Sequence, residues 1–216
     1  MQHLSLVKSL SHLREEQKHI EEISLDGFGM SLTRGAITEV GGGASTGKTG
    51  FSLALLSRLT SDGEVCAVVD AGHGFDPVTA QMAGVTLEDL LWIRCGNDVE
   101  KAFIAADYLV QAKGFGCIWL NLGGLSRSQL RMVPRSYWFR YRTRIKETAT
   151  VLLVTAAESL AGSASHGSFT FERDKTVWSG GGKFKLLREF HISLTSRKGS
   201  YGPPLRAKME FDYTDG

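Results

Sequence analysis

The chain has 216 residues, 42% of them hydrophobic, which is enough to bury one substantial core and favours a single α/β domain. Its 25 Lys and Arg against 23 Asp and Glu leave a formal charge of +2, which excludes polyanion binding driven by net charge alone. Any nucleic-acid surface must be a local patch. Cys66, Cys95 and Cys117 lie in apolar runs without C-x-x-C spacing, which predicts buried reduced thiols and a cytoplasmic protein.

The N-terminal segment predicts a helical arm over residues 1–26, ahead of a core over residues 27–216. Apolar residues recur there at three-residue steps, namely Leu4, Val7, Leu10 and Leu13. The charges among them exclude a signal peptide or a membrane span. The arm either packs as a solvated helix on its own core or a neighbour's, or serves as a dedicated partner-binding helix.

The rest of the chain alternates between strand and helix patterns. After a turn signal at residues 26–29, residues 35–40 predict a buried strand, a glycine-rich loop follows, and residues 49–59 predict a helix. Further strands are expected at residues 65–69, 90–95, 117–120 and 151–155, and helices at residues 77–83, 99–113 and 137–146. Period-two alternation predicts antiparallel strands at Phe190, Ile192, Leu194 and then at Ala207, Met209, Phe211. The order predicts an α/β fold with a mostly parallel central sheet and helices on both faces.

The glycine-rich loop carries the strongest motif in the chain. It fits G-x-x-x-x-G-K-[ST] in full and consists of Gly42, Gly43, Ala44, Ser45, Thr46, Gly47, Lys48 and Thr49. The glycines let backbone N–H groups surround a phosphate, Lys48 can reach the β and γ oxygens, and Thr49 can ligate Mg²⁺. The loop therefore predicts binding of ATP and Mg²⁺, the alternative being a relic loop that stays empty.

From Gly35 onward the chain resembles the RecA recombinase core, a P-loop NTPase fold. The run Asp-Ala-Gly-His-Gly-Phe-Asp-Pro at positions 70 to 77 carries the resemblance most sharply. The resemblance places Asp76 near the adenine amino group, while Asp70 is expected to cap the following turn.

Three positions depart from the family pattern. The resemblance places Gly72 where the family has the glutamate that activates water, and Asn121 where an aspartate holds the Mg²⁺ shell. It places Ala157 where a glutamine senses the γ-phosphate. These departures imply that no catalytic residue remains and that hydrolysis is weak or absent, unless Asp70 or Glu158 acts as the base.

A RecA-like core with eroded acids in a short chain is similar to the ImuA-type accessory proteins of SOS translesion mutasomes. This resemblance implies RecA and an inactive Y-family polymerase homologue as partners, with single-stranded DNA and self-association as further expectations. The rival function is an active DNA-dependent ATPase of the RecA or RadA recombinase type. A small-molecule P-loop kinase is weaker, because no arginine-rich lid is visible.

Two segments have the composition of a DNA-binding surface. Residues 127–146 interleave arginines with aromatic residues, which suits a single strand, but the rings could equally face the core while the arginines reach water or acids. Residues 162–182 are rich in Gly and Ser and lie where recombinases carry a mobile DNA-binding loop. The DNA-binding residues predicted there are Arg173, Lys175 and Lys183.

Overall fold

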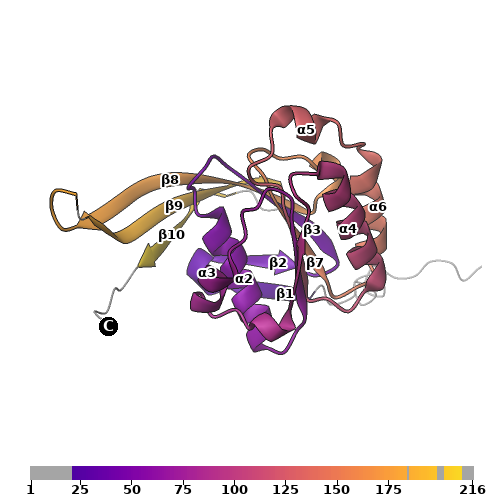
Figure 1. The fold of residues 1–216 in the computed structure, drawn as a ribbon, viewed down its shortest axis with the longest axis horizontal. Helices are drawn as coiled ribbons and strands as arrows, with labels where there is room; N and C mark the ends of the chain where they lie inside the picture. Colours follow the sequence, from indigo (N-terminus) through magenta and orange to yellow (C-terminus); the bar gives the residue numbers. More distant parts are fainter. Residues whose placement is uncertain (1–20, 184, 199–201, 211–216) are drawn as a thin grey trace, which may run out of the picture.

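The fold is a mixed α/β sandwich, seen in a computed structural model that describes residues 21–183, 185–198 and 202–210 (Figure 1). A two-stranded sheet pairs β1 (Glu22–Leu25) with β2 (Met30–Thr33). The eight strands of the main sheet are β3 (Ala36–Gly41), β4 (Cys66–Asp70), β5 (Leu90–Arg94), β6 (Cys117–Asn121), β7 (Val151–Thr155), β8 (Gly167–Ser179), β9 (Leu186–Lys198) and β10 (Leu205–Glu210). The α-helices are α2 (Lys48–Ser61), α3 (Pro77–Met82), α4 (Val99–Ala112), α5 (Arg127–Arg131) and α6 (Ser136–Ile145).

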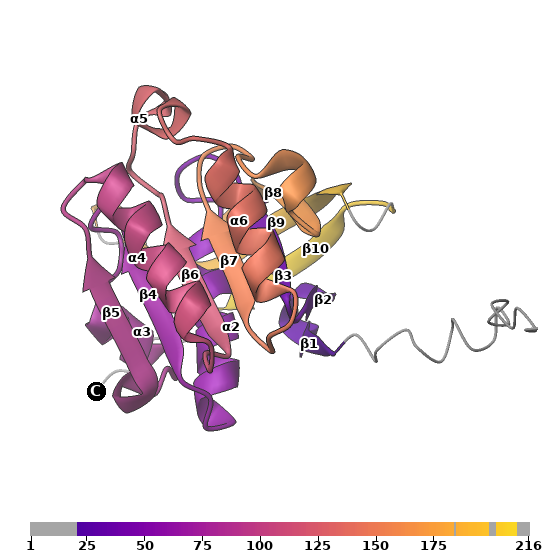
Figure 2. The ribbon, with the colours of Figure 1, turned by 90° about the vertical axis from the view of Figure 1, so that its right-hand side faces the viewer.

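The main sheet confirms the predicted fold class. Its strand order is β10-β9-β8-β3-β7-β6-β4-β5, with parallel pairing from β8 through β5 and antiparallel pairing across β8, β9 and β10. The central strands β4, β6 and β7 are buried at every position, because helices cover both faces. Helices α4 and α6 lie on one face and α2 and α3 on the other (Figure 2).

Each face has its own apolar core. On one side Phe51 of α2 packs edge-on between Phe28 and Phe171. On the other, Phe103 of α4 contacts Trp138 and Tyr141 of α6. The carboxyl ends of the parallel strands therefore meet at one well-supported edge, the place where α/β sheets bind ligands.

One expectation about a segment was wrong. Residues 162–182 are not a mobile loop, since a 3-10 turn at Gly162–Ala164 leads directly into the 13-residue strand β8. Strands β8 and β9 form a long ribbon that projects from the body (Figure 1). The predicted arm lies mostly outside the described residues, and its last part is the strand β1, whose Ile23 and Leu25 are buried.

The structure agrees with the prediction of buried thiols, because Cys66, Cys95 and Cys117 are free and buried. Within the part of the chain that the structure describes, no helix has the length and apolar character needed to cross a membrane.

Candidate nucleotide-binding site

The phosphate loop lies where the sequence predicts it, between the end of β3 and the start of α2. Gly42 and Gly47 have φ angles of 147° and 91°, which only glycine adopts readily, and Ser45 is left-handed with φ 54°. A side chain on Gly42 would place its Cβ 2.5 Å from the backbone oxygen of Phe171. The two outer glycines of the motif are therefore required by the loop's own conformation.

Lys48 folds back over the loop instead of pairing with an acid. Its ammonium donates to the carbonyl of Gly42 at 2.6 Å, to the carbonyl of Gly43, and to the hydroxyl of Thr46 at 3.3 Å. Burial lowers the pKa of Lys48 because the charged form loses water. A cation held by neutral carbonyl and hydroxyl groups is poised to receive an anion, and Thr49 is exposed beside it.

The position predicted to have lost the general base is closed by the backbone of a neighbouring loop. A Cβ on Gly72, after β4, would lie 2.0 Å from the carbonyl oxygen of Gly123, after β6. Real Cβ atoms essentially never approach that closely, and a backbone oxygen cannot swing aside as a flexible side chain can. In this arrangement the site cannot hold a glutamate at position 72.

Asn121, at the end of β6, belongs to a buried polar network. Its amide donates to Asp70 at 3.3 Å, and its oxygen accepts from the backbone of Gly123 and the hydroxyl of Thr155, both at 3.1 Å. Trp119 donates to the same Thr155 hydroxyl at 2.8 Å. Because its oxygen is already bonded, Asn121 offers neither charge nor a free lone-pair direction toward a metal shell.

Asp70 caps the following turn, as the sequence predicts. Its two oxygens accept from the backbone N–H groups of Gly74 at 2.9 Å and Phe75 at 3.1 Å, and its side chain is fully buried. A carboxylate held by these donors and by Asn121 is not free to activate water.

The third departure, Ala157, contributes only backbone to the site. Its carbonyl accepts from the N–H of Gly42 at 3.1 Å and so anchors the phosphate loop to the segment after β7. Its neighbour Glu158 pairs with Arg127 at 3.4 Å. Both residues line a cavity of about 330 Å³ together with Gly42 and Arg197.

Glu39 of β3 is a residue that the sequence reasoning missed. Its carboxylate is 2% exposed and accepts from the backbone of Leu160 and Ala161, each at 2.6 Å, and from the hydroxyl of Ser159 at 2.7 Å. It therefore fixes the crossover from β7 to β8 beside the phosphate loop. A glutamate inside an otherwise apolar strand was the available signal.

The residues fit a nucleotide's phosphates better than they fit its metal. The loop offers backbone donors, the N-terminus of α2 and Lys48, all of which suit an anion. For Mg²⁺ they offer the hydroxyl of Thr49, and among the described residues no three His, Cys, Asp or Glu side chains group as a metal site. Asp76 is placed at the N-terminus of α3, where it accepts from the backbone of Thr79 at 3.0 Å.

The predicted DNA-binding residues do not gather at this site. Arg173 and Lys175 are exposed on β8, within the projecting ribbon, and Lys183 lies in the turn beyond it. In residues 127–146 the buried rings are Trp138 and Tyr141, which supports the packing alternative for those aromatic residues.

Comparison with known proteins places this loop and the three strands that follow it in a known family. The family described as RecA N-terminal domain matches residues 15–122, which is half of the chain. The chain belongs to the RecA family. Protein RecA of Parvibaculum lavamentivorans is 38% identical over 105 residues, and that of Rhodospirillum rubrum 39% over 100 residues.

These alignments cover 45% and 43% of this chain but only 28% and 27% of the RecA proteins, so the match spans about a quarter of each relative. The fold match is broader. A crystal structure of the RadB recombinase superposes with a TM-score of 0.58, covering 82% of this chain and 87% of that one at 14% identity. That likeness shows that the RecA-family fold continues beyond the region of sequence identity.

Proposed function

We propose that this chain is a RecA-like accessory protein that binds nucleotide phosphate at Gly42 to Thr49 but hydrolyses ATP weakly or not at all. The observation that carries the proposal is the 2.0 Å approach that a Cβ on Gly72 would make to the oxygen of Gly123. The neighbouring loop has taken the space of the missing glutamate, so the loss is built into the fold. Asn121 supports the same conclusion, since its amide serves Asp70 rather than a metal shell.

The proposed setting is SOS-induced translesion DNA synthesis in the cytoplasm, in the manner of an ImuA-type mutasome protein. RecA and an inactive Y-family polymerase homologue are the proposed protein partners, with single-stranded DNA and a second copy of the chain as further ones. Support comes from membership of the RecA family combined with an eroded catalytic centre. In this role nucleotide would act as a structural ligand that orders the loop.

The test is phosphate release from Mg-ATP with and without single-stranded DNA, alongside binding of a fluorescent ATP analogue. Lys48→Ala serves as the blank, because it removes the cation at the loop. The proposal predicts analogue binding that Lys48→Ala abolishes, together with phosphate release no faster than the blank. DNA-stimulated release above the blank would overturn it.

One observation favours the rival function, an active DNA-dependent ATPase. Glu158 lines the cavity beside Gly42, and the one contact of its carboxylate among the described residues is a 3.4 Å ion pair with the exposed Arg127. If Glu158 were the base, Glu158→Gln would abolish DNA-stimulated release and leave analogue binding intact. The accessory role predicts no DNA-stimulated phosphate release in the parent protein, so Glu158→Gln should give the same result as the parent.

A further inference from the structure

A second cavity, of about 600 Å³, lies away from the phosphate loop, between α6, the start of β3 and the segment that leads into β8. We name it the α6 groove. Residues of four separate segments line it, among them Phe139 and Arg142 of α6, Lys146 at the end of that helix, His166, and Lys198 of β9. None of the described residues that line the groove is acidic. The groove therefore gathers three permanent positive charges and a histidine around one hollow.

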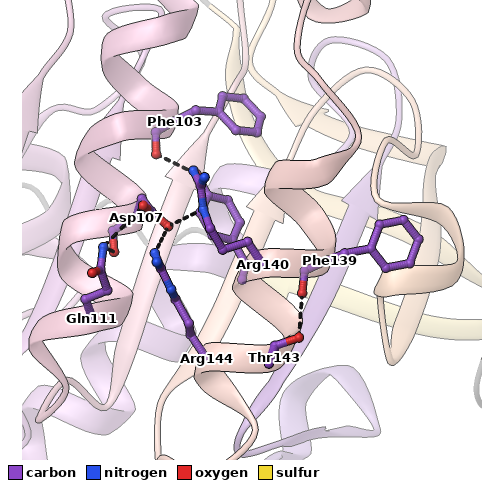
Figure 3. Close-up of polar contacts among 8 residues, drawn as sticks. Phe103, Asp107, Gln111, Phe139, Arg140, Thr143 and Arg144 are labelled. Atoms are coloured by element: carbon purple, nitrogen blue, oxygen red, sulfur yellow. Dashed lines mark hydrogen bonds and ion pairs between the residues drawn. The ribbon is translucent and has the colours of Figure 1, made fainter.

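The cations of α6 lie on different faces of the helix. Arg140 and Arg144 both pair with Asp107 of α4, Arg140 at 3.0 Å (Figure 3). Arg140 also stacks over the ring of Tyr137. The single carboxylate of Asp107 thus compensates one of these two positive charges within the fold. Figure 3 shows Phe139 and Thr143 on the side of α6 turned away from Asp107.

The groove face of α6 follows helical spacing. Phe139, Arg142, Thr143 and Lys146 recur at intervals of three and four, so they form one stripe along the helix. Arg142 donates to the carbonyl of Ser163 at 3.2 Å, which holds the guanidinium at the groove without neutralising it. Lys198 is held in the same way by the carbonyls of Gly162, Ser163 and Ser165. Both cations are positioned by neutral groups and keep their charge for a ligand.

We infer that the α6 groove binds single-stranded nucleic acid, with phosphates on Arg142, Lys146 and Lys198 and a base stacked on Phe139. Phe139 is 49% exposed, although its neighbours Trp138 and Tyr141 are buried. Sites for single strands combine an exposed aromatic ring with nearby cations. Any base can stack on the ring regardless of sequence, while the cations contact the phosphates. An acidic peptide would use the cations but leave the ring without a role. The inference deepens the DNA-binding part of the proposed function and moves it from the β8 ribbon to α6.

The test uses the full chain and a fluorescein-labelled oligonucleotide of fifteen thymidines, with affinity followed by fluorescence anisotropy over a range of salt. Arg142→Ala/Lys146→Ala should weaken binding at least tenfold and reduce the salt slope by about 1.4, since each single-strand phosphate contact contributes about 0.7. Phe139→Ala should weaken binding about tenfold with little change in slope.

The matched control is Arg58→Ala/Lys101→Ala, which removes the same charge from exposed surface ion pairs on α2 and α4. It should bind the oligonucleotide as the parent does. Circular dichroism and affinity for the fluorescent ATP analogue check that every variant is folded.

Parent-like affinity of the α6 groove variants would overturn the inference, as would no binding by the parent protein. Loss of affinity in Arg173→Ala/Lys175→Ala alone would place the DNA on the β8 ribbon instead. Competition by poly-glutamate as strong as by unlabelled oligonucleotide would identify an acidic-peptide site. Each of these results leaves nucleotide binding and phosphate release, the tests of the proposed function, untouched.

Discussion

The amide of Asn121 donates to the buried carboxylate of Asp70 at 3.3 Å, across the neighbouring strands β6 and β4. Asp70 also accepts two backbone N–H groups, so both of its oxygens are hydrogen-bonded. An aspartate at position 121 would set a second carboxylate against the first. Asn121, which looks like a lost metal ligand, is therefore the hydrogen-bond donor that Asp70 on the adjacent strand requires.

Restoring the family residue is expected to destabilise the protein. Asn121→Asp replaces a donor by a second buried charge and should lower the free energy of unfolding by about 3 kcal/mol. Urea denaturation at pH 7.5 measures this. The double variant Asp70→Asn/Asn121→Asp, with one carboxylate and one amide, should recover part of the loss. Parent-like stability of Asn121→Asp would contradict the proposed pairing.

Position 72 should tolerate no side chain. Gly72→Ala forces a Cβ toward the carbonyl of Gly123 and should cost about 1–3 kcal/mol of unfolding free energy. Gly27→Ala is the matched control, because a Cβ there meets nothing within 4 Å. Gly72→Glu should be at least as unstable as Gly72→Ala and should release no phosphate from Mg-ATP. A stable, hydrolysing Gly72→Glu would show that the loop moves aside.

The carboxylate of Glu39 should hold the crossover beside the phosphate loop. Glu39→Gln keeps the shape but loses charge-assisted hydrogen bonds, with an expected cost of about 2 kcal/mol. Hydrogen exchange at the amides of Leu160 and Ala161 should accelerate more than exchange elsewhere. Glu172→Gln, on the exposed face of β8, is the control and should change neither measurement.

The buried thiols should make stability fall at high pH. Burial raises the pKa of Cys66 to about 12, whereas an unfolded cysteine titrates near about 8.5. Because the pKa of Cys66 is higher in the folded than in the unfolded state, the contribution of its protonated thiol to the free energy of unfolding is complete below about pH 8.5. This contribution is lost as the pH rises toward 12.

Unfolding free energies measured between pH 9.5 and 10.5 test this dependence. Cys66→Ala should make the decline shallower by about 1.4 kcal/mol per pH unit, whatever its effect at neutral pH. An unchanged slope would mean that the Cys66 thiol ionises as readily in the folded state as in the unfolded one.

Local signals were enough to predict the parallel half of the sheet and the phosphate loop. The loop motif, the apolar strands and the turn cap of Asp70 are written in short stretches of sequence. The alternation at Phe190, Ile192 and Leu194 predicted β9. Strand β8 was missed because much of its outer half is exposed, so residues 162–182 show glycine and serine without a core pattern. Lys198, beyond the predicted alternation, lies at the end of β9.

Contacts between distant segments could not be predicted. Nothing in the sequence shows that Gly72 and Gly123 lie close together, and only the pairing of β4 with β6 brings their loops into contact. The same is true of Glu39, whose partners lie more than a hundred residues away. Residues of the α6 groove come from four segments, and only the structure shows that Phe139 lines the same cavity as the cations.

Strand β10 lies at one end of the main sheet, and one of its edges is covered by no other described strand. Such an edge offers unpaired backbone groups to any chain that can add a strand, which is a route to aggregation. Here Arg206, Lys208 and Glu210 alternate with apolar residues, and Lys208 pairs with Glu189 at 3.2 Å. An added strand would have to strip water from these charges. These charges therefore oppose the edge-to-edge association that an uncovered strand would otherwise invite.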